Sequence, residues 1–316
     1  MNTLHFKYAV EVEKTGSISQ AAENLFMAQP NLSKAIKELE DSLGIVIFER
    51  TSRGVSPTAQ GKEFLEYAKR ILIQLHKMES IYVPQKEREK RQMLKVSIPR
   101  GSYISAGFAN FVSALDMEKG IDITIQETNS LQTIANLADN GYNLGIIRYQ
   151  TLYENYFIDY LKEKALESEP IWEFSCLALM SAEHPMAQCD ELDVHALQKA
   201  SIEIIHGDSV VPYLPTPEIK HTFTKKDCHS KKIYVYERGS ELELLTRVTN
   251  TFMWTSPLPQ ELLDRHHFVQ RRCNINNNAF KDVFIYPHDY KLSAIDKLFL
   301  NKLYEMKNEV AFLKYN

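Results

Sequence analysis

The spacing of apolar residues changes once along the chain, at the polar segment 83–91 (VPQKEREKR). Before this segment, apolar residues recur every three or four positions, which is typical of amphipathic helices. After it, short β-branched runs alternate with helical stretches, which is typical of an α/β domain with parallel βα units. Because the segment is charged and has Pro84 at its start, it predicts a hinge. We therefore expect a helical head at 1–58, a long helix with the hinge at 59–91, and an α/β body at 92–316.

The composition is that of an ordinary globular protein, with 44% hydrophobic and 25% charged residues in 316. No apolar run approaches the length of a membrane-spanning helix, so no membrane partner is expected. The first residues have no export signal, and the four cysteines form no Cys-x-x-Cys pair. These features predict a reducing, cytoplasmic environment.

The charge is divided unevenly between the two parts of the chain. Residues 1–95 contain 15 Lys and Arg against 12 Asp and Glu, whereas residues 96–316 contain 22 against 29. A mildly basic head on an acidic body suggests a polyanionic partner for the head alone.

The head is predicted to contain three short helices and a hairpin. Their predicted ranges are 3–15, 18–25, 29–43 and, for the hairpin, 45–56. Glycines end the first and third helices, and Pro30 suits the first turn of the third because a proline has no N–H to satisfy. Two closely joined helices followed by a hairpin predict a winged helix-turn-helix.

Several motifs in the head resemble those of the LysR-type transcriptional regulators. They are 16–25 (GSISQAAENL), 29–40 (QPNLSKAIKELE), 43–44 (LG), 48–50 (FER) and 58–61 (TAQG). The body is similar to the family more loosely, through its strand and helix rhythm and 182–187 (AEHPMA). The resemblance implies a sequence-specific DNA-binding regulator whose body is a two-lobed, periplasmic-binding-protein-like effector domain. It also implies a homodimer or homotetramer, a small-molecule effector, and a possible contact with RNA polymerase.

The DNA-contacting residues are expected at the start of the third helix and on the wing. Gln29 and Asn31 can bond base edges, and Pro30 can touch a thymine methyl group. The other expected contacts, to phosphates or to a minor groove, are Ser33, Lys34, Lys37, Arg50 and Arg53. Two positions depart from the family: Ala28 stands where Ser or Thr is usual, and Asn31 where a small residue is common. The alternative is a solvated polar face on an ordinary three-helix bundle.

The helix after the wing is expected to form the dimer. Its apolar residues alternate at spacings of four and three, which is a heptad pattern: Phe64, Ala68, Ile71, Leu75, Met78 and Tyr82. Two-fold pairing would present two reading helices to half-sites about 34 Å apart or a multiple of that distance. The alternative is a helix packed against its own domain.

The resemblance divides the body into lobe I, 92–166 with 268–316, and lobe II, 167–267. Ligands of open α/β sheets bind beyond the carboxyl ends of the strands. The candidate effector contacts at these ends are Ser102, Thr128, Arg148 and His206. Arg148 can clamp a carboxylate with two hydrogen bonds, which favours an anionic effector. The segment 149–168 is longer than the pattern requires and has a helical spacing.

Other function classes fit less well. The chain has no Gly-x-Ser-x-Gly elbow, no Gly-x-Gly-x-x-Gly fingerprint and no phosphate-binding Gly-Lys-Ser/Thr loop, so no enzymatic activity or cofactor is expected. His266 and His267 lack the spacing of zinc ligands, so no metal site is expected. A protein that only binds a solute is disfavoured, because that function does not require the helical head and the helix that follows it. A regulator whose body binds a protein partner, or no ligand, stays open.

Overall fold

The computed structural model describes residues 2–51, 54–81, 91–100, 102–189, 191–206, 231–236, 238–274 and 279–313. The predicted hinge lies outside the described residues except for Arg91, and Arg53 and Tyr82 lie outside them as well. The chain forms two compact units, the first consisting largely of Met1–Glu89 and the second of the remainder. Among the described residues, no helix has the length and apolar character needed to cross a membrane.

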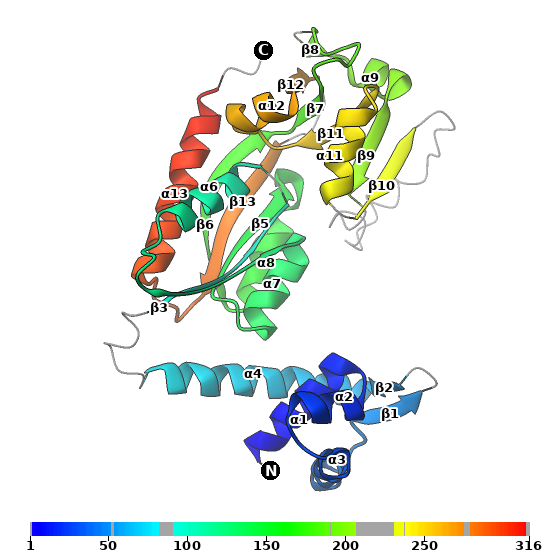
Figure 1. Ribbon diagram of the computed structural model, residues 1–316, viewed down its shortest axis with the longest axis vertical. Helices are drawn as coiled ribbons and strands as arrows, with labels where there is room; N and C mark the ends of the chain where they lie inside the picture. The colour runs from blue at the N-terminus through cyan, green and yellow to red at the C-terminus, as the bar shows by residue number, and fades with distance from the viewer. Residues whose placement is uncertain are drawn as a thin grey trace. The chain divides into compact units, whose positions relative to one another are not determined.

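The head has the predicted order of elements (Figure 1). They are α1 Thr3–Thr15, α2 Ile18–Asn24, α3 Gln29–Leu43, β1 Phe48–Thr51, β2 Gly54–Pro57 and α4 Ala59–Ile81. The side chains of Asn2 and Ser17 cap α1 and α2 by accepting backbone N–H groups. Gly16 and Gly44 end α1 and α3 in the left-handed conformation that glycine adopts without steric cost. The predicted helices and hairpin are therefore confirmed.

One apolar core joins the three helices to the start of α4. Its fully buried members include Leu32 and Leu39 of α3, Ile47 before the wing, and Leu65 of α4. The first half of α4 thus completes the head, so a boundary at residue 58 does not separate two packing units.

Gly61 is where α4 approaches the segment that leads into the wing. A Cβ atom at this position would lie 2.0 Å from the carbonyl oxygen of Ile47, too close for any side chain. The backbone itself therefore requires glycine there.

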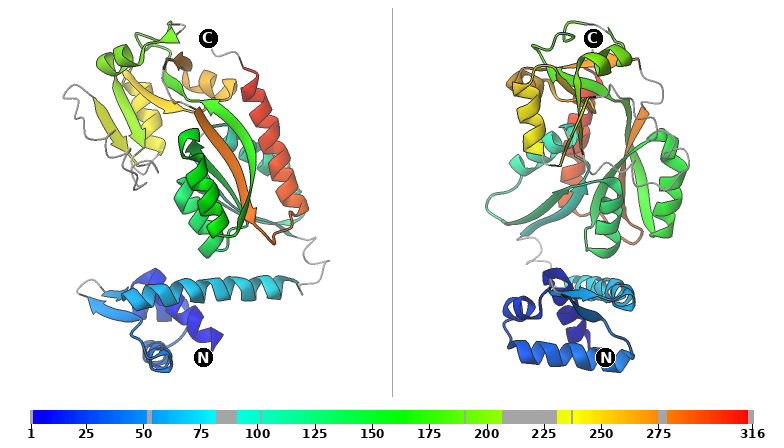
Figure 2. Two further views of the ribbon diagram at one scale, coloured as in Figure 1. Left: turned by 180° about the vertical axis from the view of Figure 1, so that it is seen from behind. Right: turned by 90° about the vertical axis from the view of Figure 1, so that its right-hand side faces the viewer.

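The body contains two sheets, and the first is mixed rather than wholly parallel. Its strand order is β4-β3-β5-β13-β6, from Gly120–Glu127, Arg91–Ile98, Leu144–Gln150, Ala279–Pro287 and Leu166–Ser175. β3 pairs in parallel with β4 and β5, whereas β13 runs antiparallel to both β5 and β6. Helices α6 (Ser102–Ser113) and α13 (Ala294–Ala311) cover one face of this sheet. Helices α7 (Ser130–Asp139) and α8 (Glu154–Glu163), the latter after the short η1 (Thr151–Tyr153), cover the other (Figures 1 and 2).

The second sheet has the order β10-β9-β11-β7-β12-β8. Its strands are Lys232–Val235, Ile202–His206, Thr251–Thr255, Leu177–Ser181, Phe268–Cys273 and Glu191–Leu192. Its helices are α9 Val194–Ala200, α11 Arg238–Arg247 and α12 Gln260–His266. β9 pairs in parallel with β10 and β11, while β7 runs antiparallel to β11 and β12.

The lobe boundaries differ from those predicted at 166/167 and 267/268. β6 belongs to the five-stranded sheet of lobe I, and β12 belongs to the six-stranded sheet of lobe II. The chain therefore crosses between the sheets at Cys176, between β6 and β7, and returns between β12 and β13. Sequence periodicity marks strands but does not say which sheet receives a long strand, so both boundaries shift.

The long segment 149–168 is helical, as its spacing predicts. It forms η1 and α8, and α8 buries Phe157 and Leu161 against lobe I. The ring of Phe157 stacks on Tyr149 of β5 with a centroid distance of 4.7 Å. The extra length thus becomes a helix that covers one face of the sheet.

Candidate functional site

The start of α3 presents the predicted base-reading residues to solvent. Gln29, Pro30 and Asn31 are exposed, whereas Leu32 and Leu39 face the core. Further along the helix, Lys34 and Lys37 are exposed and Ser33 is half-buried. The predicted contacts on α3 therefore lie outside the head's own core, and this helix can enter a groove without unfolding any part of the head.

The cap of α3 has no side-chain hydrogen bond. Ala28 occupies the N-cap position, and its carbonyl oxygen accepts from the N–H groups of Asn31 and Leu32 at 3.0 and 3.2 Å. Pro30 sets the helical backbone angle of the first turn. The helix therefore begins without the hydroxyl that Ser or Thr would offer to a phosphate.

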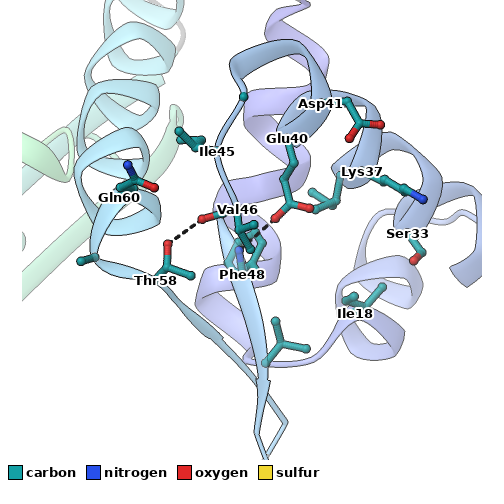
Figure 3. Close-up of a pocket in the computed structure, with 14 residues that line it drawn as sticks. Ile18, Ser33, Lys37, Glu40, Asp41, Ile45, Val46, Phe48, Thr58 and Gln60 are labelled. Carbon is teal, nitrogen blue, oxygen red and sulfur yellow. Dashed lines mark hydrogen bonds between the residues drawn. The ribbon is translucent and has the colours of Figure 1, made fainter.

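A groove of about 970 Å³ lies between α3, the wing and the start of α4, and Figure 3 shows its lining. Glu40 holds the segment that enters the wing, because its Oε1 accepts from the N–H groups of Ile47 at 2.7 Å and Phe48 at 3.1 Å. Ser33 and Lys37, two predicted phosphate contacts, line the same groove. The groove thus borders the predicted DNA-binding face.

Thr58 fixes the start of α4 to the same segment. Its hydroxyl donates to the carbonyl oxygen of Val46 at 2.6 Å and accepts from the N–H of Gly61 at 2.9 Å. The wing itself is tied to the turn after α1, because the N–H of Val55 donates to the carbonyl oxygen of Gly16 at 2.9 Å. The backbone of Arg50 pairs with Val55 in the hairpin, but its side chain lies outside the described residues.

Lys34 forms an ion pair within α3. Its Nζ lies 3.8 Å from Oε1 of Glu38, and both side chains are largely exposed. An exposed pair at this spacing contributes roughly 0.3–0.5 kcal/mol, so little free energy opposes a change of partner to a phosphate.

The predicted dimer seam on α4 divides into two sets of residues. Ala68 is buried in the head core, and Phe64 packs edge-on against Phe6 at a centroid distance of 5.6 Å. Ala68 was therefore assigned wrongly to a partner surface, since it is buried within its own subunit, whereas Phe64 is half-buried and its place in the seam stays a prediction. Ile71 and Met78 are 43% and 52% exposed, and Leu75 is half-buried.

The sequence interpretation missed Tyr67, which is 59% exposed. It precedes Ile71 by four positions and Met78 by eleven, so the three side chains share one face of α4. In the sequence, Tyr67 and Ala68 fit the apolar spacing with Ile71 equally well, because they precede it by four and three positions. Only the packing of the head shows that Ala68 is buried and Tyr67 is exposed.

Arg148 does not offer a clamp to a ligand, which corrects the sequence prediction. Its Nε and Nη2 donate to the two carboxylate oxygens of Asp282, each at 2.7 Å. The Asp282 carboxylate is fully buried, and it also accepts from the hydroxyl of Tyr103 at 2.6 Å. The chain's own carboxylate thus occupies the position that was predicted for an effector. β5 and β13 pair in a register that places Arg148 opposite Asp282.

The surroundings of this pair shift the pKa values of Arg148, Tyr103 and Cys176. Burial lowers the pKa of Arg148, but the Asp282 carboxylate outweighs it and the net shift is upward. Burial raises the pKa of Tyr103, and the neighbouring carboxylate raises it further. Burial likewise raises the pKa of Cys176 to about 12, although Arg148 opposes the shift, so that thiol stays protonated near neutral pH.

The other predicted effector contacts are Ser102, Thr128 and His206. The side chain of Ser102 is outside the described residues. Thr128 is buried, and its N–H donates to the carbonyl oxygen of Ile98 at 2.9 Å. Nδ1 of His206 lies 2.7 Å from Oε1 of Glu241 in α11. Of the two residues whose side chains the structure describes, His206 is paired with Glu241 through its ring, while the hydrogen bond of Thr128 is made by its backbone N–H.

Two contacts between the lobes were not predicted. Nη1 of Arg238, at the start of α11, donates to Oε1 of Glu127 at 2.8 Å and to Oγ of Ser105 at 3.3 Å. Nη1 of Arg148 donates to Oγ of Ser256 at 3.2 Å. These partners are more than a hundred residues apart along the chain, so no local pattern could indicate them.

Among the residues that the structure describes, no three or more His, Cys, Asp or Glu side chains are grouped to hold a metal ion. The candidate sites in the described residues are therefore the exposed face of α3 and the junction of the two lobes.

Residues 4–62 match the family described as bacterial regulatory helix-turn-helix protein, lysR family. Over 309 residues the chain is 30% identical to a probable RuBisCO transcriptional regulator of Thalassiosira pseudonana, covering 95% of each sequence. It is 44% identical over 72 residues to the HTH-type transcriptional regulator ClcR of Pseudomonas putida, covering 23% of this chain and 24% of ClcR. It is 24% identical over 207 residues to the regulator AlsR of Bacillus subtilis, covering 64% of this chain and 63% of AlsR. The last two matches each span less than two thirds of the relative.

Solved structures share the whole fold at low sequence identity. A full-length variant of OxyR from Pseudomonas aeruginosa has a TM-score of 0.63 at 17% identity, covering 97% of this chain and 94% of that one. Full-length CbnR complexed with its target DNA has a TM-score of 0.58 at 16% identity, covering 97% and 100%. At this identity the likeness shows the fold alone.

Proposed function

The chain belongs to the LysR family of regulatory helix-turn-helix proteins, and from that membership we propose that it is a sequence-specific DNA-binding regulator of transcription. The observation that carries the proposal is the exposed start of α3, where Gln29, Pro30 and Asn31 face solvent while the rest of the helix anchors the core. Lys34 and Lys37 of α3 flank this surface with ammonium groups suited to phosphates, and we propose that Arg50 and Arg53 of the wing add further phosphate contacts. The proposed ligand is double-stranded DNA. We propose that the protein acts in the cytoplasm, and we assign no catalytic activity to it.

Replacing Gln29 by alanine is expected to weaken binding to the preferred site by about 1–3 kcal/mol and to relax discrimination at one base pair. Fluorescence anisotropy should be measured with a labelled duplex selected from a randomised library by the full chain, and with its single-base variants. As a matched control, Lys34→Ala should weaken binding to every duplex similarly and reduce the salt dependence. Wild-type discrimination at every base pair in Gln29→Ala would contradict base reading by this residue.

We propose that the dimer forms through the face of α4 that carries Tyr67, Ile71 and Met78. These large apolar side chains are exposed in the single chain, at a spacing that two antiparallel or parallel helices can interdigitate. Pairing would bury them and present two α3 helices to one duplex. The same measurement of mass distinguishes a dimer from a tetramer.

The double substitution of Ile71 and Met78 by aspartate is expected to lower the mass in solution, because charged carboxylates cannot be buried in an apolar seam. Light scattering on the full chain measures this, and binding to two adjacent half-sites should fall with it. Lys62→Asp, an exposed position on another face of α4, should leave the mass unchanged. An unchanged mass in the double variant would exclude this seam.

We also propose that a small-molecule effector binds between the two lobes and biases the arrangement of the heads. Support comes from the carboxyl ends of β4 and β9, near Thr128 and His206, where open α/β sheets place their ligands. Arg148 and Arg238 are both paired with carboxylates, so the predicted preference for an anion is not retained. A body that binds RNA polymerase, or no ligand, is the alternative. Thermal shifts of the full chain with a metabolite panel would distinguish these possibilities.

A further inference from the structure

Phe26 has the greatest exposure of any large apolar side chain in the described part of the protein, at 98%. It lies in the turn between α2 and α3, three positions before Gln29. Its backbone φ is +53°, in the left-handed region, which it shares with only two other non-glycine residues among those described. An aromatic residue in that region is sterically unfavourable.

The hydrogen bonds of the turn match the left-handed conformation of Phe26. The N–H of Met27 donates to the carbonyl oxygen of Ala22 and that of Phe26 to Glu23, each at 3.0 Å. This pattern ends α2 and requires a left-handed residue at position 26, where glycine is the usual choice. A phenylalanine there strains the turn, and its exposed ring contributes no packing to the head in return.

We infer that Phe26 is a DNA contact, whose ring packs on the deoxyribose and phosphate backbone at the edge of the groove that receives α3. The inference rests on the proposed function. Met27 is partly exposed and Ala28, Gln29 and Pro30 are exposed, so Phe26 stands in the same exposed stretch of chain as the proposed reading residues. Ala28 supplies no hydroxyl to a phosphate there, and an apolar ring can instead cover the C–H surface of a sugar.

The experiment compares wild type, Phe26→Ala, Phe26→Gly and Phe26→Tyr as full chains. Binding is measured on a fluorescein-labelled duplex selected from a randomised library. Phe26→Ala keeps the unfavourable backbone and loses the ring, and we expect about tenfold weaker binding. Because no charge is removed, the dependence of affinity on salt should be unchanged. Phe26→Tyr keeps an aromatic ring and should bind within about twofold of wild type.

Phe26→Gly separates a DNA contact from a structural role. Glycine removes the ring and relieves the backbone, so its melting temperature should rise while its DNA affinity falls as far as that of Phe26→Ala. A residue that acts only through the fold would not show these opposite changes.

Three results would overturn the inference. The first is wild-type affinity in both Phe26→Ala and Phe26→Gly. The second is wild-type affinity combined with lost transcription by RNA polymerase on the same template, which would assign the ring to a protein partner. The third is a wild-type chain that binds no duplex at low salt, which would remove the proposed function together with the inference.

Discussion

Asp282→Ala is expected to lower the free energy of unfolding of the body by about 3–5 kcal/mol, because it leaves the guanidinium of Arg148 buried without its carboxylate. The Asp282 side chain is fully buried, that of Arg148 is 15% exposed, and two hydrogen bonds of 2.7 Å join them. Tyr103 would lose its acceptor at the same time. Urea unfolding of the full chain, followed by tryptophan fluorescence, measures the change, since Trp172 packs against Tyr103.

Two further measurements show whether the loss comes from the unpaired charge. The double variant Arg148→Met, Asp282→Leu removes both charges and should be more stable than Asp282→Ala, since no buried charge is left without a partner. Sodium formate, a small carboxylate, should raise the melting temperature of Asp282→Ala more than that of wild type, with sodium chloride at equal ionic strength as the control. A loss below about 1 kcal/mol in the single variant would mean that water reaches Arg148 easily.

Gly61→Ala is the second substitution with a large expected effect. The added Cβ would lie 2.0 Å from the carbonyl oxygen of Ile47, and both partners are backbone, so no side-chain rotation relieves the contact. Moving α4 away would also lengthen the hydrogen bonds of Thr58 to Val46 and Gly61. We expect a loss of about 3 kcal/mol in the stability of the head, at the upper end of the range for overpacked sites.

The measurement is thermal unfolding together with DNA affinity. Gly239→Ala is the matched control, because this glycine lies in α11 with nothing within 4 Å of the added methyl group. It should be neutral or stabilise by up to about 1 kcal/mol. Similar melting curves for the two alanine variants would show that α4 is not held tightly against Ile47.

The head could be predicted from the sequence because its elements depend on neighbours in the chain. Gly16 and Gly44 end helices, Pro30 begins one, and apolar spacing identifies the core. The division of α4 into an inner and an outer stripe could not be predicted. Ala68 and Ile71 fit the same heptad, and only the packing of α1 against α4 shows that the first is buried and the second exposed.

The body's site was the least predictable part. Arg148 and Asp282 are 134 positions apart, and their pairing depends on the register of β5 with β13. Sequence periodicity places each residue on a strand but does not specify a partner for it. An arginine at a strand end therefore suggested a ligand clamp, although the fold supplies the carboxylate from its own last strand.

The position of β13 in the first sheet has a consequence for biosynthesis. This strand lies between β5 and β6, yet it is translated after the entire second lobe. A nascent chain that has emerged only as far as β12 therefore exposes two unpaired strand edges and lacks the acid that neutralises Arg148. The apolar core of the winged head contains only residues from the first part of the chain, so the head can fold on the ribosome long before the body does.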